Sequence, residues 1–99
     1  MSRNPETIIQ QEIINYLKDR RIFHFRVNAD INTVGIPDLI VCYRGYFIGL
    51  EVKTKKGKIS KLQLEVAKEI NNNGGFVCFP TSVEDVKNLL NKIDEESDK

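Results

Sequence analysis

The sequence has little of the residue types on which many catalytic and metal sites depend. It holds one histidine, two cysteines and no tryptophan in 99 residues. The single histidine argues against a His-based triad or a multi-histidine metal site within one chain, and no Cys/His cluster has zinc spacing. Cys42 and Cys78 each stand inside an apolar run, which favours two buried free thiols over a disulfide or a metal site.

Long hydrophobic runs are also lacking. None approaches the roughly 18 consecutive apolar residues of a membrane span, and the N-terminal "MSRNPETIIQ" has no apolar signal region. The lack of both segments makes a cytoplasmic protein the default expectation. The length predicts a single domain over residues 1–99, with a small core that would gain from a partner subunit. The acidic end, residues 94–99, is expected to be a frayed tail.

Charge is present but unevenly distributed. The net charge is only +1, yet basic residues dominate up to residue 61, where "KDRR" and "KTKKGKISK" stand, and acidic residues dominate after it. A basic surface in the first part suits a polyanion such as nucleic acid. A solvated lysine-rich loop explains the same pattern, so charge alone leaves both interpretations open.

The hydrophobic pattern predicts the order αβββαβα. Helices are expected over residues 5–20, 61–73 and 82–93, and strands over residues 22–27, 38–43, 46–53 and 76–79. The Arg44-Gly45 pair is typical of a two-residue hairpin loop. Because the strand "LIVCY" is apolar throughout, we expect an α/β fold with helices on both faces of the sheet.

The hairpin register places charge in an unusual position. With Arg44-Gly45 as the loop, Asp38 pairs directly with Glu51, and Lys53 points to the same face. Facing carboxylates about 5 Å apart repel each other. A divalent cation such as Mg²⁺ would remove that cost, and Lys53 would supply positive charge beside it. An Asp–Lys–Glu surface network at a sheet edge is the alternative interpretation.

The sequence resembles a known nuclease family on these and other motifs. "PD" followed by "EVK" is similar to the PD-(D/E)XK nuclease signature. The wider pattern "GIPDLIV…FIGLEVK…GKISKLQ…NNNGGFVCFPTSVEDV" resembles the virus-type replication-repair nuclease (VRR-NUC) family across nearly the whole chain. The resemblance implies a restriction-endonuclease-like αβββαβα core with a mixed central sheet. It also implies a phage or prophage origin, and therefore a bacterial host cytoplasm.

The resemblance assigns roles to the hairpin residues. Asp38, Glu51 and Lys53 would be catalytic. Asp38, Glu51 and the backbone carbonyl of Val52 would bind Mg²⁺, for which Mn²⁺ would substitute. A metal-bound water would then attack a phosphodiester. Stand-alone members resemble Holliday junction resolvases, which implies branched DNA as the substrate and a homodimer, with the first or last helix as a potential interface.

Helical positions would complete that site. The family has a glutamate near the start of its first helix, and Glu6 lies within the apolar stripe around Ile9, whereas Glu12 lies towards its edge. We therefore assign Glu6, although an acid in the first turn also favours the helix dipole. Gln63 matches a family glutamine, and "SKLQ" equally fits a capping box. Gln10, one turn after Glu6, is expected to line the same pocket and to contact the nucleic acid.

Several basic residues are expected to contact the DNA backbone. They are Lys55, Lys56, Lys58 and Lys61, which follow the catalytic strand, and Arg26, which precedes the "NADINTV" loop. Arg44 is expected to be solvated at the hairpin tip. Besides a junction-resolving enzyme, two alternatives remain: a less selective nickase or flap nuclease using the same site, and a DNA-binding module that no longer cleaves.

Overall fold

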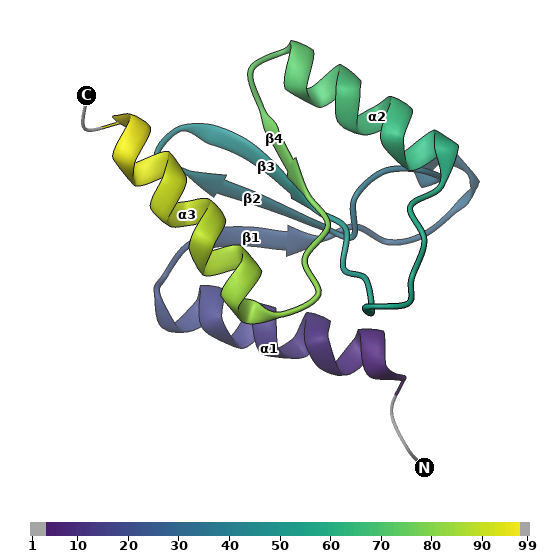
Figure 1. Cartoon of the computed structure of the whole chain (residues 1–99), viewed down its shortest axis with the longest axis horizontal. Helices are drawn as coiled ribbons and strands as arrows, with labels where there is room; N and C mark the ends of the chain where they lie inside the picture. The colour runs from purple at the N-terminus through teal and green to yellow at the C-terminus, as the bar shows by residue number, and fades with distance from the viewer. Residues whose placement is uncertain (1–3, 98–99) are drawn as a thin grey trace.

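Three helices and a four-stranded sheet follow one another in the predicted order (Figure 1). The computed structural model describes residues 4–97. The elements are α1 (Pro5–Asp19), β1 (Phe23–Arg26), the short 3₁₀ helix η1 (Ile31–Thr33), β2 (Leu39–Tyr43), β3 (Tyr46–Leu50), α2 (Lys61–Asn72), β4 (Phe76–Cys78) and α3 (Val83–Ser97).

The sheet is mixed, with the strand order β1-β2-β3-β4. The first three strands are antiparallel neighbours, and β4 runs parallel to β3. Helices α1 and α3 lie on one side of the sheet and α2 on the other (Figure 1). The expected α/β architecture, with a mixed sheet and helices on both faces, is therefore confirmed.

The core lies between the sheet and the α1/α3 layer. Apolar side chains at helical spacing on α1 and α3 meet alternate residues of β2 and β3. The fully buried members include Ile13, Leu17, Val41, Leu50 and Leu90. Burial of each such side chain contributes about 1.5–3 kcal/mol relative to exposure, so this layer is the main source of the fold's stability.

The β2–β3 hairpin has the predicted register. Arg44 and Gly45 have φ values of 52° and 84°, the positive values that a type I′ turn requires at both central positions. Tyr43 pairs with Tyr46, and the ladder ends at the pair Leu39–Leu50. The next residues outward, Asp38 and Glu51, therefore leave the ladder side by side.

The other face of the sheet is only partly covered. Helix α2 packs mainly on β4, where Gly75 allows the side chain of Ile70 to approach the backbone closely. The cross-strand neighbours Phe23, Cys42 and Phe47 remain exposed as a result. The prediction that both cysteines are buried is therefore wrong for Cys42. Cys78 is half-buried, and its burial raises the pKa of its thiol to about 11.

The C-terminal helix is longer than predicted. It continues to Ser97, so the expected frayed tail is wrong for residues 94–97, and residues 98–99 lie outside the described residues. Asp94 holds this end against the hairpin: its Oδ1 accepts a hydrogen bond from the Tyr43 hydroxyl at 2.8 Å and pairs with Arg44 at 2.9 Å. Arg44 is therefore not simply solvated. Among residues 4–97, no helix has the length and apolar character needed to cross a membrane.

Candidate active site

Asp38 and Glu51 meet where β2 begins and β3 ends, and three strands fix their backbones. The backbone N–H of Val27, just after β1, donates to the Asp38 carbonyl at 2.9 Å. The Glu51 N–H donates to the Cys78 carbonyl of β4, also at 2.9 Å. The Val52 N–H donates to Asp38 Oδ2 at 3.1 Å, which ties the Asp38 side chain to the strand that carries Glu51. We call Asp38 and Glu51 the carboxylate pair.

The carboxylate pair is electrostatically strained. Glu51 is 7% exposed and is the single charged residue among the buried side chains of the described chain. Burial raises the pKa of Glu51 to about 8, helped by the negative charge of Asp38 and by a hydrogen bond between the two carboxyl groups. Near neutral pH the buried Glu51 carboxyl is therefore mostly protonated in the metal-free protein, because its pKa lies near 8.

Two further charges act on Glu51. The ammonium group of Lys53 lowers the pKa of Glu51, and the carboxylate of Glu6 raises it. Lys53 is half-buried, and its backbone N–H donates to the Pro80 carbonyl at 3.0 Å, which continues the parallel pairing with the chain after β4. The structure thus brings Glu6 into electrostatic range of the pair. Glu12 is exposed further along α1 and is not among the groups that shift Glu51.

Glu6 is placed by the start of its helix. Asn4 caps α1, its side chain accepting a hydrogen bond from the Glu6 N–H at 2.8 Å, and Pro5 occupies the first helical position. The side chain of Glu6 is exposed, so the prediction that it lies within the buried stripe of α1 is wrong. Figure 1 shows the beginning of α1 and the segment between β3 and α2 at the same end of the molecule.

The donor set around the carboxylate pair fits a hard divalent cation. Within residues 4–97, no group of three or more His, Cys, Asp or Glu side chains is arranged to hold a metal ion. Mg²⁺ does not require such a group, because it commonly binds through one or two carboxylates and completes its shell with waters and phosphate oxygens. Burial is the largest cause of the raised pKa of Glu51 and the negative charge of Asp38 is the next, and a cation bound between the two carboxylates would offset both.

Gln63 is fixed by its helix cap. Its Oε1 accepts a hydrogen bond from the Ser60 N–H at 2.9 Å, while the Ser60 hydroxyl accepts one from the Gln63 N–H at 3.1 Å. The expected capping box is therefore confirmed. The cap uses Oε1 alone, so the amide NH₂ of this half-buried side chain can still donate to a ligand.

Gln10 and Arg26 do come together, beside Asp38. They line a pocket of about 420 Å³, which is completed by Val27, Asn28 and Ala29. Sequence reasoning missed Asn28. It stands two residues after Arg26 along the chain and lines the same pocket. The alternation of side chains along a continued strand is the signal by which it could have been found.

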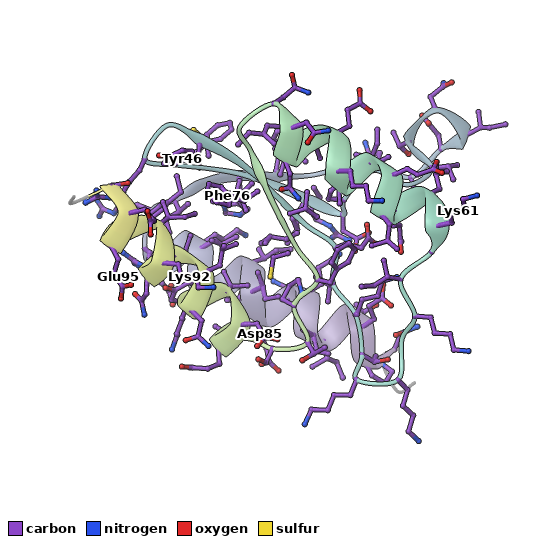
Figure 2. All side chains as sticks on the ribbon, turned by 45° about the horizontal axis from the view of Figure 1, so that its top comes forward. Tyr46, Lys61, Phe76, Asp85, Lys92 and Glu95 are labelled. Atoms are coloured by element: carbon purple, nitrogen blue, oxygen red, sulfur yellow. The ribbon has the colours of Figure 1, made fainter. Side chains whose placement is uncertain are left out.

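The lysines that are predicted to contact DNA lie on the segment between β3 and α2 and at the start of α2. Lys55, Lys56 and Lys58 are exposed on it, and Lys61 is exposed at the first residue of α2. Figure 2 shows Lys61 at the end of the molecule opposite the C-terminal part of α3, where Glu95 lies. The basic segment follows Glu51 directly along the chain and so begins beside the carboxylate pair, whereas Arg44 pairs with Asp94 at the hairpin turn.

A larger cavity, of about 530 Å³, lies along α3. Asp85, Lys92 and Glu95, which Figure 2 labels on that helix, are among its lining residues. Neither member of the carboxylate pair lines it. Its size alone does not make it a catalytic site, and the perturbed carboxyl of Glu51 marks the other end of the molecule as the better candidate.

Solved structures share this fold. One named "VRR_NUC domain" is 22% identical in sequence, with a TM-score of 0.75 over 90% of this chain and 97% of that one. Another, named "VRR_NUC domain protein", is 18% identical, with a TM-score of 0.70 over 96% of this chain and 89% of that one. No protein-family model and no curated protein matches the sequence. The likeness shows that this chain shares the fold of these two structures, as the resemblance in sequence predicted.

Proposed function

We propose that this chain belongs to the VRR-NUC family and is a Mg²⁺-dependent endonuclease that hydrolyses phosphodiester bonds in branched DNA. The observation that carries the proposal is the carboxylate pair. Its two members lie side by side, the pKa of Glu51 is raised to about 8 by burial and by Asp38, and Lys53 acts on the same carboxyl. A purely structural sheet edge has no need for like charges in contact, whereas a metal-dependent phosphodiesterase does.

The roles of the residues follow from their chemistry. Asp38, Glu51 and the Val52 carbonyl would hold Mg²⁺, with Mn²⁺ able to substitute. When bound, the ion supplies a polarised water and positive charge beside the scissile phosphate. The Lys53 ammonium stabilises negative charge that develops on the phosphate and holds the attacking water by a hydrogen bond. Glu6 would accept a hydrogen bond from that water, and the Gln63 amide would donate one to a phosphate oxygen.

The substrate class is inferred from charge. The exposed lysines between β3 and α2 offer contacts to phosphates but no groove-reading geometry, so we infer backbone recognition rather than base-sequence recognition. Such contacts weaken steeply as salt is raised. A four-way junction is the branched substrate that we propose first, because a homodimer would carry two sites to two strands.

We place the proposed dimer contact on the exposed sheet face rather than on α1 or α3. Phe23, Phe25 and Phe47 are 69%, 51% and 47% exposed there. Strand β1 is an edge strand with an antiparallel neighbour. A second copy can pair with that edge about a two-fold axis, because an antiparallel pair of identical strands is self-complementary. The pairing would also cover the aromatic side chains.

The deciding experiment compares substrates and metals. A labelled four-way junction, a flap and a linear duplex are incubated with the protein in Mg²⁺, Mn²⁺ or EDTA. Paired symmetric nicks in the junction, lost in EDTA, support the proposal. Equal cutting of all three substrates supports the less selective nickase instead. Binding without metal-dependent cutting, unchanged by Lys53→Ala, supports a non-cleaving DNA-binding module.

A further inference from the structure

Residues from separate parts of the chain form the polar pocket beside Asp38. Hydrolysis at the carboxylate pair does not by itself require such a pocket. It has a volume of about 420 Å³, within the roughly 300–1,000 Å³ of small-molecule sites. Its walls come from α1 through Gln10, from the end of β1 through Arg26, and from the following segment through Asn28. Asp38 closes the pocket on the side of the carboxylate pair.

Backbone and loop hydrogen bonds hold the pocket wall. The Thr33 hydroxyl donates to the Asn28 carbonyl at 3.2 Å, and the Asp30 N–H donates to Thr33 Oγ1 at 2.8 Å. Asp30 and Thr33 also form the capping box of η1. Together with the bond from Val27 to the Asp38 carbonyl, these contacts fix the segment without using the Asn28 side chain.

The polar groups that face the pocket are available to a ligand. Over the described range, residues 4–97, the side chains of Gln10, Arg26 and Asn28 have no hydrogen-bond or ion-pair partner. Each amide offers both donors and an acceptor, the combination that matches the edge of a nucleobase. Arg26 is exposed and offers the fork of donors that matches a phosphate.

The negative charge of Asp38 decides which part of a nucleotide fits inside the pocket. Without a bound cation, a phosphate inside the pocket would be repelled by the Asp38 carboxylate, whereas a neutral base or sugar would not be repelled. We therefore infer a base inside the pocket and the adjoining phosphate on Arg26 at its mouth. A base in a continuous duplex is already paired and stacked, so it enters such a pocket only after extrusion, which is least costly where the base is unpaired.

We propose that this pocket binds a nucleotide of the cleaved strand that has left the base stack, next to the phosphodiester at the carboxylate pair. Gln10 and Asn28 contact the base edge, and Arg26 contacts the neighbouring phosphate. The inference rests on the proposed nuclease function and deepens it, because it gives a physical origin for selecting branched DNA. Strands at a branch offer nucleotides that leave the stack easily, and a linear duplex does not.

The test measures binding in EDTA, so that no cleavage occurs. Affinities for a labelled flap and a labelled linear duplex are measured by fluorescence anisotropy for the wild type, Gln10→Ala and Asn28→Ala. Gln11→Ala is the matched control on α1, since Gln11 bonds to Asn15 instead, and Asn72→Ala is the control for Asn28. Circular dichroism and urea midpoints establish that each variant is folded.

We expect Gln10→Ala and Asn28→Ala each to weaken flap binding by roughly tenfold, as loss of a base-edge contact does, and duplex binding by less than about twofold. The controls should change neither. With 2-aminopurine at successive unpaired positions of the flap, the wild type should change the fluorescence at one position, and both variants should lose that signal. Equal weakening on both DNAs, or no weakening, overturns the proposal.

The two proposals fail separately. Metal-dependent cleavage by the wild type, with a flap preference that Gln10→Ala and Asn28→Ala leave intact, refutes the pocket and keeps the nuclease. If the protein cuts no DNA in any metal, the proposed nuclease function is refuted. If such a protein still prefers the flap, and loses that preference in Gln10→Ala and in Asn28→Ala, the proposed role of the pocket is supported.

Discussion

The carboxylate pair predicts that the metal-free protein loses stability as the pH rises. The pKa of Glu51 is raised from 4.5 to about 8 in the folded chain, so the native state holds a proton that the unfolded state has released. The stabilisation is fully present below the unfolded value near 4.5 and is lost as the pH rises through about 8. The slope for one proton is about 1.4 kcal/mol per pH unit, so the loss between pH 5 and pH 8 is on the order of 3–4 kcal/mol.

Asp38→Asn should remove part of that loss. The amide oxygen of an asparagine can still accept the hydrogen bond from Val52, which spans 3.1 Å in the wild type, while the negative charge beside Glu51 disappears. Burial is the larger cause of the raised pKa and remains. We therefore expect the variant to be more stable than the wild type at pH 8 by about 1–2 kcal/mol, the effect of a like charge that shifts a pKa by roughly one unit.

Urea denaturation in EDTA at pH 5, 6.5 and 8 measures this directly. The wild type, Asp38→Asn and Glu51→Gln are compared, with Glu65→Gln on the exposed face of α2 as the matched control. The difference between wild type and Asp38→Asn should grow with pH, and the control should follow the wild type. A wild-type stability that is flat or rises from pH 5 to pH 8, or an Asp38→Asn variant less stable at pH 8, would refute the account of the pair.

Three further outcomes are expected. Addition of Mg²⁺ at pH 8 should raise the urea midpoint of the wild type but not of Asp38→Asn or Glu51→Gln, and equal shifts in all three would contradict a metal site at the pair. Asp94→Ala should lower the free energy of unfolding by about 1–2 kcal/mol, because the Tyr43 hydroxyl loses its acceptor. A change below about 0.3 kcal/mol in urea titrations is within the range of a neutral surface substitution. Such a result would show that this contact does not stabilise the fold. Phe25→Glu should convert the proposed dimer to a monomer in analytical ultracentrifugation, whereas an unchanged sedimentation coefficient would exclude the β1 edge as the interface.

The part of the site that lies on one hairpin was predictable from sequence. The Arg44-Gly45 turn fixes a register with a period of two, so counting outward from it places Asp38 opposite Glu51. The capping box at Ser60 is equally local and was predicted for the same reason. These predictions need only nearest-neighbour geometry, which a short segment specifies by itself.

Features that depend on the packing of distant elements were not predictable in this way. Cys42 is exposed because α2 packs on β4 and leaves β1 and β2 uncovered, which an apolar run cannot reveal. Residues 94–97 remain helical where the sequence predicted fraying, and Asp94 in that turn bonds to the hairpin, more than 50 positions earlier in the chain. Asn28 becomes a pocket residue only when α1 brings Gln10 opposite it.

The central claim is that the carboxylate pair is the metal-dependent hydrolytic site, and cleavage by a folded pair variant tests it most directly. Cleavage of a labelled four-way junction in Mg²⁺ is measured for the wild type, Glu51→Gln and the control Glu65→Gln. The account predicts that the wild type and the Glu65→Gln control cut the junction and that EDTA abolishes this cutting. It predicts that Glu51→Gln folds and binds the junction but does not cut it. Metal-dependent cutting by Glu51→Gln at the wild-type rate would contradict it.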